Sequence, residues 1–453
     1  MSEQKSTPGA RDSFSSKFGV IAAAAGSAVG LGNVWRFPYI AGEGGGSAFL
    51  IIYIGFVLLL GIPIAVAEFS IGRHGQANAM TSFKNIAPGT KWHLTGFLGI
   101  LAAFIILSYY TTISGWTLEY MVNSFSIGEA SSPMNNPNYF QDFISEPFRP
   151  ILLQAIFMLL TAGIVVFGVS KGIEKASKIL MPLLLLLIIV MCIRAVTLEG
   201  GMEGVKFLVK PDFSKVTGQT FLNAMGQAFF SLSLGMGVMI TYGSYIQKKD
   251  NLLSSAAQIA LADTVIAVLS GIMVFGSAFA FGIAPSQGPS LVFVTLPNIF
   301  KDMFMGNVFA FIFFLLLAIA ALTSAISIFE AIVAYIHERF KMSRIQASAL
   351  GVVLVLAVGI PITLSEGELG NLKILGRNLL DFFDFLASNI MLPLGALLMT
   401  LFAGWFHGHQ GFRDEITNGG TANMKIYPAL EVLIRFVAPV FIVIILVAGI
   451  MQI

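Results

Sequence analysis

Two short glycine-rich segments interrupt long apolar stretches of the chain and carry the groups best suited to binding a small molecule. Residues 26–33 read GSAVGLGN and residues 231–237 read SLSLGMG, so each segment contains Gly-x-Gly near its end. If these segments unwind a helix inside a membrane, the freed N–H groups suit a carboxylate. The freed carbonyl oxygens suit an ammonium or a small hard cation. Two facing breaks can therefore bind a zwitterionic amino acid.

The glycines have an alternative explanation, because small residues are common wherever membrane helices pack closely. A matched pair of interrupted segments at corresponding positions in two halves of a chain instead favours a transporter binding site.

The alternatives for Glu68, late in the second apolar stretch, are a place near the membrane surface or a cap on neighbouring backbone.

Other polar side chains lie within or beside apolar stretches. Thr323 and Ser324 are adjacent hydroxyls, which either bind a ligand or bond back to the preceding helical turn. Asp263 lies deep in an apolar stretch, and a carboxylate there is costly enough to indicate function. Arg36 and Asp384 fall on one side of the membrane, either as a pair that closes the site or as two unrelated interfacial charges.

The composition requires a lipid environment. The 453 residues are 56% hydrophobic and only 11% charged, whereas a soluble globular protein carries about 25% charged residues. The net charge of +2 gives no basic excess for nucleic acid, and the single cysteine, Cys192, excludes an internal disulfide. The polar residues 1–17 lead into an apolar segment without a cleavage site, so we expect a retained first helix after a cytoplasmic N-terminal segment.

Eleven stretches are long and apolar enough to span a membrane, which predicts an all-α integral membrane protein with one transporter domain over residues 1–453. The predicted helices cover 18–40, 46–72, 94–124, 149–169, 176–198, 220–246, 252–283, 306–338, 345–365, 377–406 and 430–453. The two glycine-rich segments fall in the first and the sixth, which we expect to be discontinuous.

Positive charges in the short loops predict the orientation. Lysine and arginine residues concentrate before the first helix and after the second, fourth, sixth and eighth helices, which places the N-terminus in the cytoplasm. The 125–148 loop has no lysine or arginine and is expected outside, although the 194–219 loop, with Arg194, Lys206, Lys210 and Lys215, fits this scheme poorly. An odd number of helices places Ile453 outside the cell, in a multi-pass protein of the plasma membrane.

Three motifs resemble those of the neurotransmitter:sodium symporter family. Residues 25–39 read AGSAVGLGNVWRFPY, residues 227–235 read QAFFSLSLG, and residues 321–324 read ALTS. The similarity extends along essentially the whole chain and is strongest to the bacterial branch, whose members transport leucine or several hydrophobic amino acids. Such members usually have twelve helices, and this chain resembles those with eleven. The resemblance implies an inverted repeat of helices 1–5 (18–198) and 6–10 (220–406), followed by helix 11 (430–453).

The resemblance also implies two sodium ions and a substrate site. The second sodium site would use carbonyls of Gly26, Val29 and Ala320 and the hydroxyls of Thr323 and Ser324. The first would use Ala28, Asn33, Ser231, Asp263 and the substrate carboxylate. The substrate would contact Ala28, Leu31, Gly32, Ile106, Tyr110, Phe230, Ser231, Ser233, Met236, Ser324 and Ile328. None of the residues that would line the pocket for the substrate's side chain is charged. The pocket therefore predicts hydrophobic L-amino acids, aliphatic and aromatic.

Asp263 departs from the family pattern, in which asparagine is usual and some bacterial members carry a glutamate one helical turn later, where this chain has Ala267. We expect Asp263 to supply the negative charge that chloride provides elsewhere in the family, although Tyr53, Gln227 and Ser231 match the chloride-binding residues. The resemblance further implies gates formed by Arg36 with Asp384 outside, and by Arg11 with Glu338 and Tyr245 inside, where Phe14 replaces a tryptophan.

The fifth helix contains Gly172 and Pro182, so its cytoplasmic end either unwinds during transport or has a static kink.

Three rival functions remain to be weighed. A channel is disfavoured by two discontinuous helices around an amino-acid-shaped site. An enzyme is disfavoured because the sequence has no His-Glu-x-x-His, Gly-x-Ser-x-Gly or evident nucleophile–base pair. A proton-coupled amino-acid transporter of the same fold is closer, because Asp263 is itself titratable.

Overall fold

The computed structural model describes residues 13–129, 131–282, 291–422 and 424–451, and within these ranges every regular element is a helix. Nine continuous helical segments there are long and apolar enough to cross a membrane, and a bent pair of helices adds a tenth candidate. The nine are Ser47–Gly75, His93–Ser126, Phe148–Val165, Val169–Thr197, Leu252–Ala280, Gly306–Phe340, Arg344–Leu364, Leu379–Phe406 and Tyr427–Ile450.

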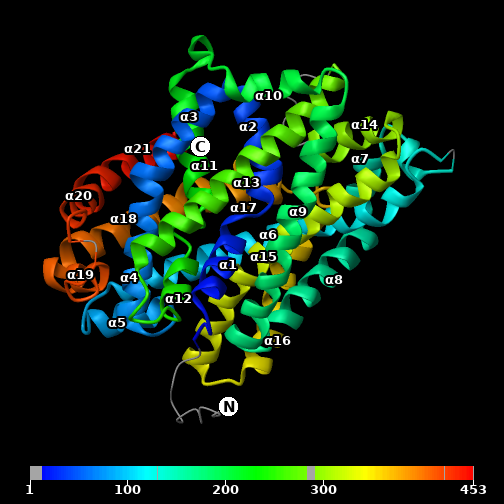
Figure 1. Cartoon of the computed structure of the whole chain (residues 1–453). Helices are drawn as coiled ribbons and strands as arrows, with labels where there is room; N and C mark the ends of the chain where they lie inside the picture. Colours follow the sequence, from blue (N-terminus) through cyan, green and yellow to red (C-terminus); the bar gives the residue numbers. More distant parts are fainter. Residues whose placement is uncertain (1–12, 130, 283–290, 423, 452–453) are drawn as a thin grey trace, which may run out of the picture.

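Figure 1 shows these segments as a bundle of long helices that run between two ends of the molecule. Their labelled parts are α3 (Ser47–Phe56), α4 (Ile62–Gly75), α6 (His93–Asn123), α8 (Phe148–Val165), α9 (Lys175–Thr197), α13 (Leu252–Ala280), α15 (Gly306–Phe340), α16 (Arg344–Leu364), α17 (Leu379–Phe385), α18 (Leu392–Leu401), α20 (Tyr427–Val432) and α21 (Ala438–Ile450).

Several spans continue through a π-helical turn instead of ending. Such turns carry one extra residue and often occur at functional sites. They are η2 (Val57–Gly61), η5 (Val169–Glu174), η8 (Leu386–Met391), η9 (Phe402–Phe406) and η10 (Leu433–Val437).

The first and sixth predicted helices are both broken. The first consists of α1 (Lys17–Ala28), followed after three residues by the π turn η1 (Gly32–Arg36) and by α2 (Phe37–Glu43), with a bend of 49°. The sixth consists of α11 (Gly218–Ser231) and α12 (Val238–Gly243). All eleven predicted helices thus have a counterpart, although the halves of the sixth are each too short to span a membrane alone.

Short helices that the sequence did not predict connect the spans. They are α5 (Ala79–Ile86), α7 (Tyr139–Ser145), α10 (Gly201–Val209), α14 (Leu296–Asp302) and α19 (Gly408–Thr417), with 3-10 turns η3 (Ser124–Ser126), η4 (Pro133–Asn135) and η6 (Phe213–Lys215). Nearly every residue of α1 after Lys17 and Phe18 is wholly or largely buried, and α1 packs against α9, α13 and α15. By contrast, α21 lies at the edge of the bundle and exposes apolar side chains such as Val443 and Val447, as a lipid-facing helix does.

Candidate functional site

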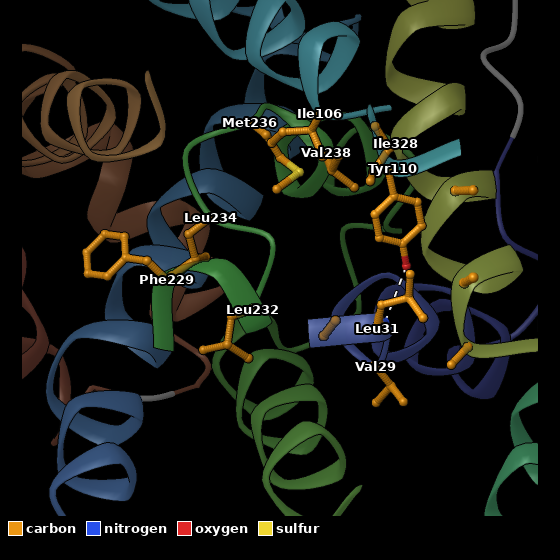
Figure 2. Close-up of a cluster of buried hydrophobic side chains, with 14 of the residues drawn as sticks. Val29, Leu31, Ile106, Tyr110, Phe229, Leu232, Leu234, Met236, Val238 and Ile328 are labelled. Atoms are coloured by element: carbon orange, nitrogen blue, oxygen red, sulfur yellow. Dashed lines mark hydrogen bonds between the residues drawn. The ribbon is translucent and has the colours of Figure 1, made fainter. Parts of the chain in front are cut away.

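The first break leaves backbone groups that side chains from other helices bind. Helix α1 ends at Ala28, and Val29 takes an extended conformation with φ −79° and ψ 97°. Beyond it, the Leu31 N–H donates to the Tyr110 hydroxyl at 3.3 Å, a contact drawn in Figure 2. Tyr110 comes from the middle of α6, so a neighbouring helix fixes the peptide that follows the break.

The second break is held by a buried carboxylate. Residues 232–237 leave the helix, and Ser233 and Gly235 have φ of 53° and 82°. A Cβ at Gly235 would lie 2.3 Å from the Leu392 carbonyl oxygen, so both the backbone conformation and the close approach require glycine. The Gly235 N–H donates to Oε1 of Glu68 at 2.7 Å. Of the two alternatives for Glu68, the structure therefore has the backbone cap.

The two breaks lie against one another. The Ser233 hydroxyl donates to the Ser27 carbonyl at 3.0 Å, and the hydroxyls of Ser27 and Ser233 are 3.2 Å apart. Around this contact lies a cavity of about 20 Å³, lined by Ser27, Ala28, Gly30, Gly32, Ile106, Tyr110, Phe230, Ser231, Ser233, Met236, Ser324 and Ile328.

This lining contains every predicted substrate residue except Leu31, which lines a second, larger cavity on the α2 side of the break. It adds Ser27 and Gly30, which the sequence reasoning did not assign to the substrate. Both belong to the GSAVGLGN segment, so assigning the whole unwound segment to the site would have included them.

Oxygen atoms converge where α15 passes the first break. The Thr323 hydroxyl lies 3.0 Å from the Ala320 carbonyl and 3.5 Å from the Val29 carbonyl. The Ser324 hydroxyl lies 3.3 Å from the Gly26 carbonyl and 3.4 Å from the Val29 carbonyl. The five residues predicted for a second sodium site therefore meet, and Thr323 also bonds back to Ile319 at 3.1 Å, as the alternative for it proposed.

A second polar cluster surrounds the buried carboxylate of Asp263. The Asn33 side-chain amide donates to Oδ1 at 2.7 Å, the Ser231 hydroxyl lies 2.6 Å from both oxygens, and the Tyr53 hydroxyl donates to Oδ2 at 2.8 Å. Asn33, Ser231 and Asp263 come from η1, α11 and α13, so three segments converge. Ala28 is adjacent, because it lines the same cavity as Ser231. In addition, the Gln227 amide donates to the Gly32 carbonyl at 3.0 Å.

Known families and structures match this arrangement over nearly the full chain. The model of the "Sodium:neurotransmitter symporter family" matches residues 11–149 and 149–453. The chain belongs to this family. A sodium-dependent transporter of Bacillus subtilis, itself uncharacterized, is 41% identical over 98% of this chain and 98% of its own length. The sodium-dependent serotonin transporter of Drosophila melanogaster is 27% identical over 97% of this chain and 76% of its own length.

A solved structure supports the same assignment. The crystal structure of MhsT in complex with L-phenylalanine matches with a TM-score of 0.89 and 44% identity, covering 97% of this chain and all of that one. The protein is thus an all-helical, multi-pass membrane protein and a sodium-dependent symporter with the inverted-repeat fold of its family.

On the α2 side of the breaks, this symporter has a cavity of about 420 Å³ that shares Gly32, Tyr110 and Phe230 with the smaller one. Arg36 and Asp384 both line it. Among the ion pairs of the described residues none joins these two. The Arg36 guanidinium instead lies 4.7 Å from the centre of the Phe230 ring, and Asp384 accepts from the Tyr109 hydroxyl at 2.9 Å and from Ser388 at 3.0 Å. The predicted outer gate pair is therefore not closed in this structure.

On the α1 side of the breaks, the symporter is tightly packed around the predicted Tyr245 and Phe14, together with two residues that were not predicted. Tyr245 donates to Glu330 at 2.8 Å, and Phe14 packs edge-to-face with Tyr245 at 6.2 Å between ring centres. Glu330 is fully buried on α15 and also accepts from the Arg344 guanidinium. The sequence analysis missed both Glu330 and Arg344, although a glutamate within an apolar helical stretch was a visible signal.

The remaining gate residue on this side is Glu338, which accepts from the backbone and side-chain N–H groups of Asn78 at 2.9 and 2.7 Å. Arg11, its predicted partner, lies outside the described residues.

Pro182 lies inside the continuous helix α9, which follows the π turn η5, so this end of the fifth span is helical here.

One titratable group lies in a loop at the mouth of the larger cavity. Glu366, between α16 and α17, lines that cavity and accepts from the Asn378 amide at 3.1 Å. Burial, together with the nearby Asp381 carboxylate, raises the pKa of Glu366 to about 7. Glu366 therefore gains its negative charge only near neutral pH.

Proposed function

We propose that this symporter imports hydrophobic L-amino acids, aliphatic and aromatic, by alternating access with two sodium ions and without chloride. The observation that carries the proposal is the cavity between the two breaks. It combines backbone and hydroxyl groups for an amino acid's charged atoms with the apolar side chains of Ile106, Phe230, Met236 and Ile328. No charged side chain lines it, so a charged substrate side chain would remain unpaired in a buried site. MhsT, a similar structure, binds L-phenylalanine.

The two breaks would together bind the carboxylate and the ammonium group of the amino acid. The substrate carboxylate would meet the N–H groups of Leu31 and Gly32 and the Tyr110 hydroxyl, because Tyr110 already bonds to this peptide. The ammonium would meet carbonyls near Ala28, Phe230 and Ser231. Because the cavity is about 20 Å³, the space of roughly one water molecule, its walls must move apart to admit substrate.

The oxygen clusters fit two co-transported sodium ions, because carbonyl, hydroxyl and carboxylate oxygens are what hard cations prefer. One ion would bind among Gly26, Val29, Ala320, Thr323 and Ser324. The other would bind among Ala28, Asn33, Ser231, Asp263 and the substrate carboxylate. A carboxylate shared by ion and substrate makes each raise the affinity of the other, and this linkage is reciprocal.

Asp263 supports chloride independence. Its carboxylate is buried and bonded to the neutral donors Asn33, Ser231 and Tyr53, which brings a fixed negative charge to the position where other family members need an anion. The alternative is a proton-coupled transporter of the same fold, in which Asp263 carries the coupling proton.

The proposed orientation places the N-terminus in the cytoplasm and the C-terminus outside, in the plasma membrane. An odd number of crossings places the two ends on opposite sides of the membrane, and the lysine and arginine residues of the short loops set the direction.

Uptake into proteoliposomes tests the proposal. We expect concentrative uptake of leucine and phenylalanine under an inward sodium gradient, undiminished when gluconate replaces chloride, and little uptake under a proton gradient alone. The Asp263→Asn variant should lose at least about 90% of this uptake, which corresponds to roughly 1.4 kcal/mol, or regain it only with chloride. Chloride-dependent uptake by the unmodified protein would contradict the role of Asp263. Uptake driven by protons without sodium would favour the alternative.

A further inference from the structure

Glu174 joins two segments that the proposed transport cycle must separate. It is the last residue of the π turn η5, and its side chain is only 1% exposed. Oε2 accepts from the Ser15 N–H at 2.7 Å, while Oε1 accepts from the hydroxyls of Ser15 and Ser16 at 2.6 and 2.9 Å. Lys178, one turn later, completes the set at 2.6 Å. Three of the four donors thus belong to the residues that precede α1.

These bonds fix the first turn of α1 against η5. Ser16 is the N-cap of α1, and its hydroxyl accepts from the Gly19 N–H at 3.1 Å while it donates to Glu174. A Cβ at Gly19 would lie 2.1 Å from Oε1 of Glu174, so a side chain at this position would displace the carboxylate from its present place. The contact therefore positions α1 as well as capping it.

The other side of the contact is a weakly supported stretch of helix. The span begins after Gly168, which has φ of 85°, and its first turn is a π turn. Further along, Pro182 lacks the N–H that would bond to the carbonyl of residue 178. Only Lys178 within the helix itself bonds to the Glu174 carboxylate. If α1 moved away, the buried carboxylate would lose three donors at once, and a buried charge without partners is strongly disfavoured.

We propose that Glu174 is a positioning residue that couples withdrawal of α1 to opening of the 169–182 segment, so that the two occur as one step. While Ser15, Ser16 and Lys178 bind the carboxylate, both segments stay closed. When α1 leaves, the carboxylate must be hydrated, and hydration of this end of the fifth span follows. The inference rests on the proposed transport cycle, because alternating access requires α1 to move.

Hydrogen exchange of the purified full-length protein, with and without sodium, tests the coupling without a transport substrate. We expect Glu174→Gln to speed amide exchange of residues 17–28 and 169–182 together, by about tenfold each, in sodium-free buffer, with partial reversal by sodium. Exchange in 427–450 should not change. The matched control is Glu203→Gln, because Glu203 is 58% exposed and pairs with Lys206 on the surface.

Two further variants approach the same contact from α1. Ser15→Ala removes one donor, and Gly19→Ala displaces a carboxylate that stays charged from its donors, so both should raise exchange in the two segments together, the second by more. Glu174→Asp should restore part of the protection. Faster exchange in one segment only, in any of these variants, would overturn the coupling, as would no change in either. Since exchange needs no amino acid, a negative result for leucine uptake would refute the proposed function and leave this test intact.

Discussion

The two ends of the binding site differ in how their charged residues are used. On the α1 side, carboxylates are buried in contact with cations: Glu330 with Arg344, Glu174 with Lys178, and Glu415 of α19 with Arg73 of α4. On the α2 side, Glu119 of α6 is also buried against Arg149, but the charged residues around the cavity of about 420 Å³ are used differently: Arg36 lies over Phe230, and Asp384 accepts from two hydroxyls.

This difference determines what each end would have to do in the proposed alternating-access cycle. A buried ion pair costs about 3–5 kcal/mol to break at one partner, and each hydroxyl bond to a carboxylate contributes about 1.5–3 kcal/mol. Opening toward the α1 side would have to separate ion pairs, whereas closing the α2 side would bring together Arg36 and Asp384, which are not bonded to each other. In the proposed cycle, sodium and substrate bound between the two ends would offset this asymmetry.

Breaking the pair between Glu330 and Arg344 should have the largest effect. Glu330→Ala removes the buried carboxylate that binds the Arg344 guanidinium and the Tyr245 hydroxyl, so we expect a loss of roughly 3–5 kcal/mol in stability. Thermal unfolding in detergent, followed by tryptophan fluorescence or size-exclusion recovery, measures it. The double variant Glu330→Gln with Arg344→Gln removes both charges and should recover most of the loss. A single variant as stable as the unmodified protein would show that the α1 side is not held by this pair.

The effect of Asp384→Asn should be smaller on stability and large on uptake. Asparagine retains an acceptor for Tyr109 and Ser388, so unfolding should shift by less than about 1 kcal/mol. Sodium-driven uptake should fall at least several-fold, because closure of the α2 side needs the negative charge opposite Arg36. The charge-conserving Asp384→Glu variant is the control. If Asp384→Asn destabilised the protein as much as Glu330→Ala does, the contrast between the ends would be wrong.

Much of this architecture was predictable because the membrane restricts it. Long apolar runs gave the eleven helices, and the glycine pairs located both breaks, with the second at residues 232–237. The contact between Asn33, Ser231 and Asp263 followed from the family resemblance. The interactions of the α1 side were not predictable, since Glu174 and Ser15 are 159 residues apart and nothing in either segment specifies the other. Short helices such as α5 and α14 were missed because their apolar runs are too brief to distinguish from loops.

A pH titration should give the smallest effect and compare the two ends directly. On the α1 side, burial alone would raise the pKa of Glu415, but hydrogen bonds from Lys248 and Arg73 lower it. On the α2 side, burial and Asp381 raise the pKa of Glu366 from 4.5 to about 7. A raised carboxyl pKa means that the folded state binds more protons, so the contribution of Glu366 is complete below pH 4.5 and is lost as the pH rises through 7. A lowered pKa means the opposite, so the contribution of Glu415 is lost only in more acidic solution.

The unfolding temperature should therefore decrease as the pH rises from 5 to 8, and part of this decrease should come from ionisation of Glu366. In the Glu366→Gln variant, which is neutral at every pH, that component should disappear, and the variant should be more stable than the unmodified protein at pH 8. Glu415→Gln should leave the slope in this range unchanged while lowering stability throughout. An unaltered slope in Glu366→Gln would mean that the loop carboxylate is ionised throughout this range. The α2 side would then carry the negative charge of Glu366 below neutral pH as well.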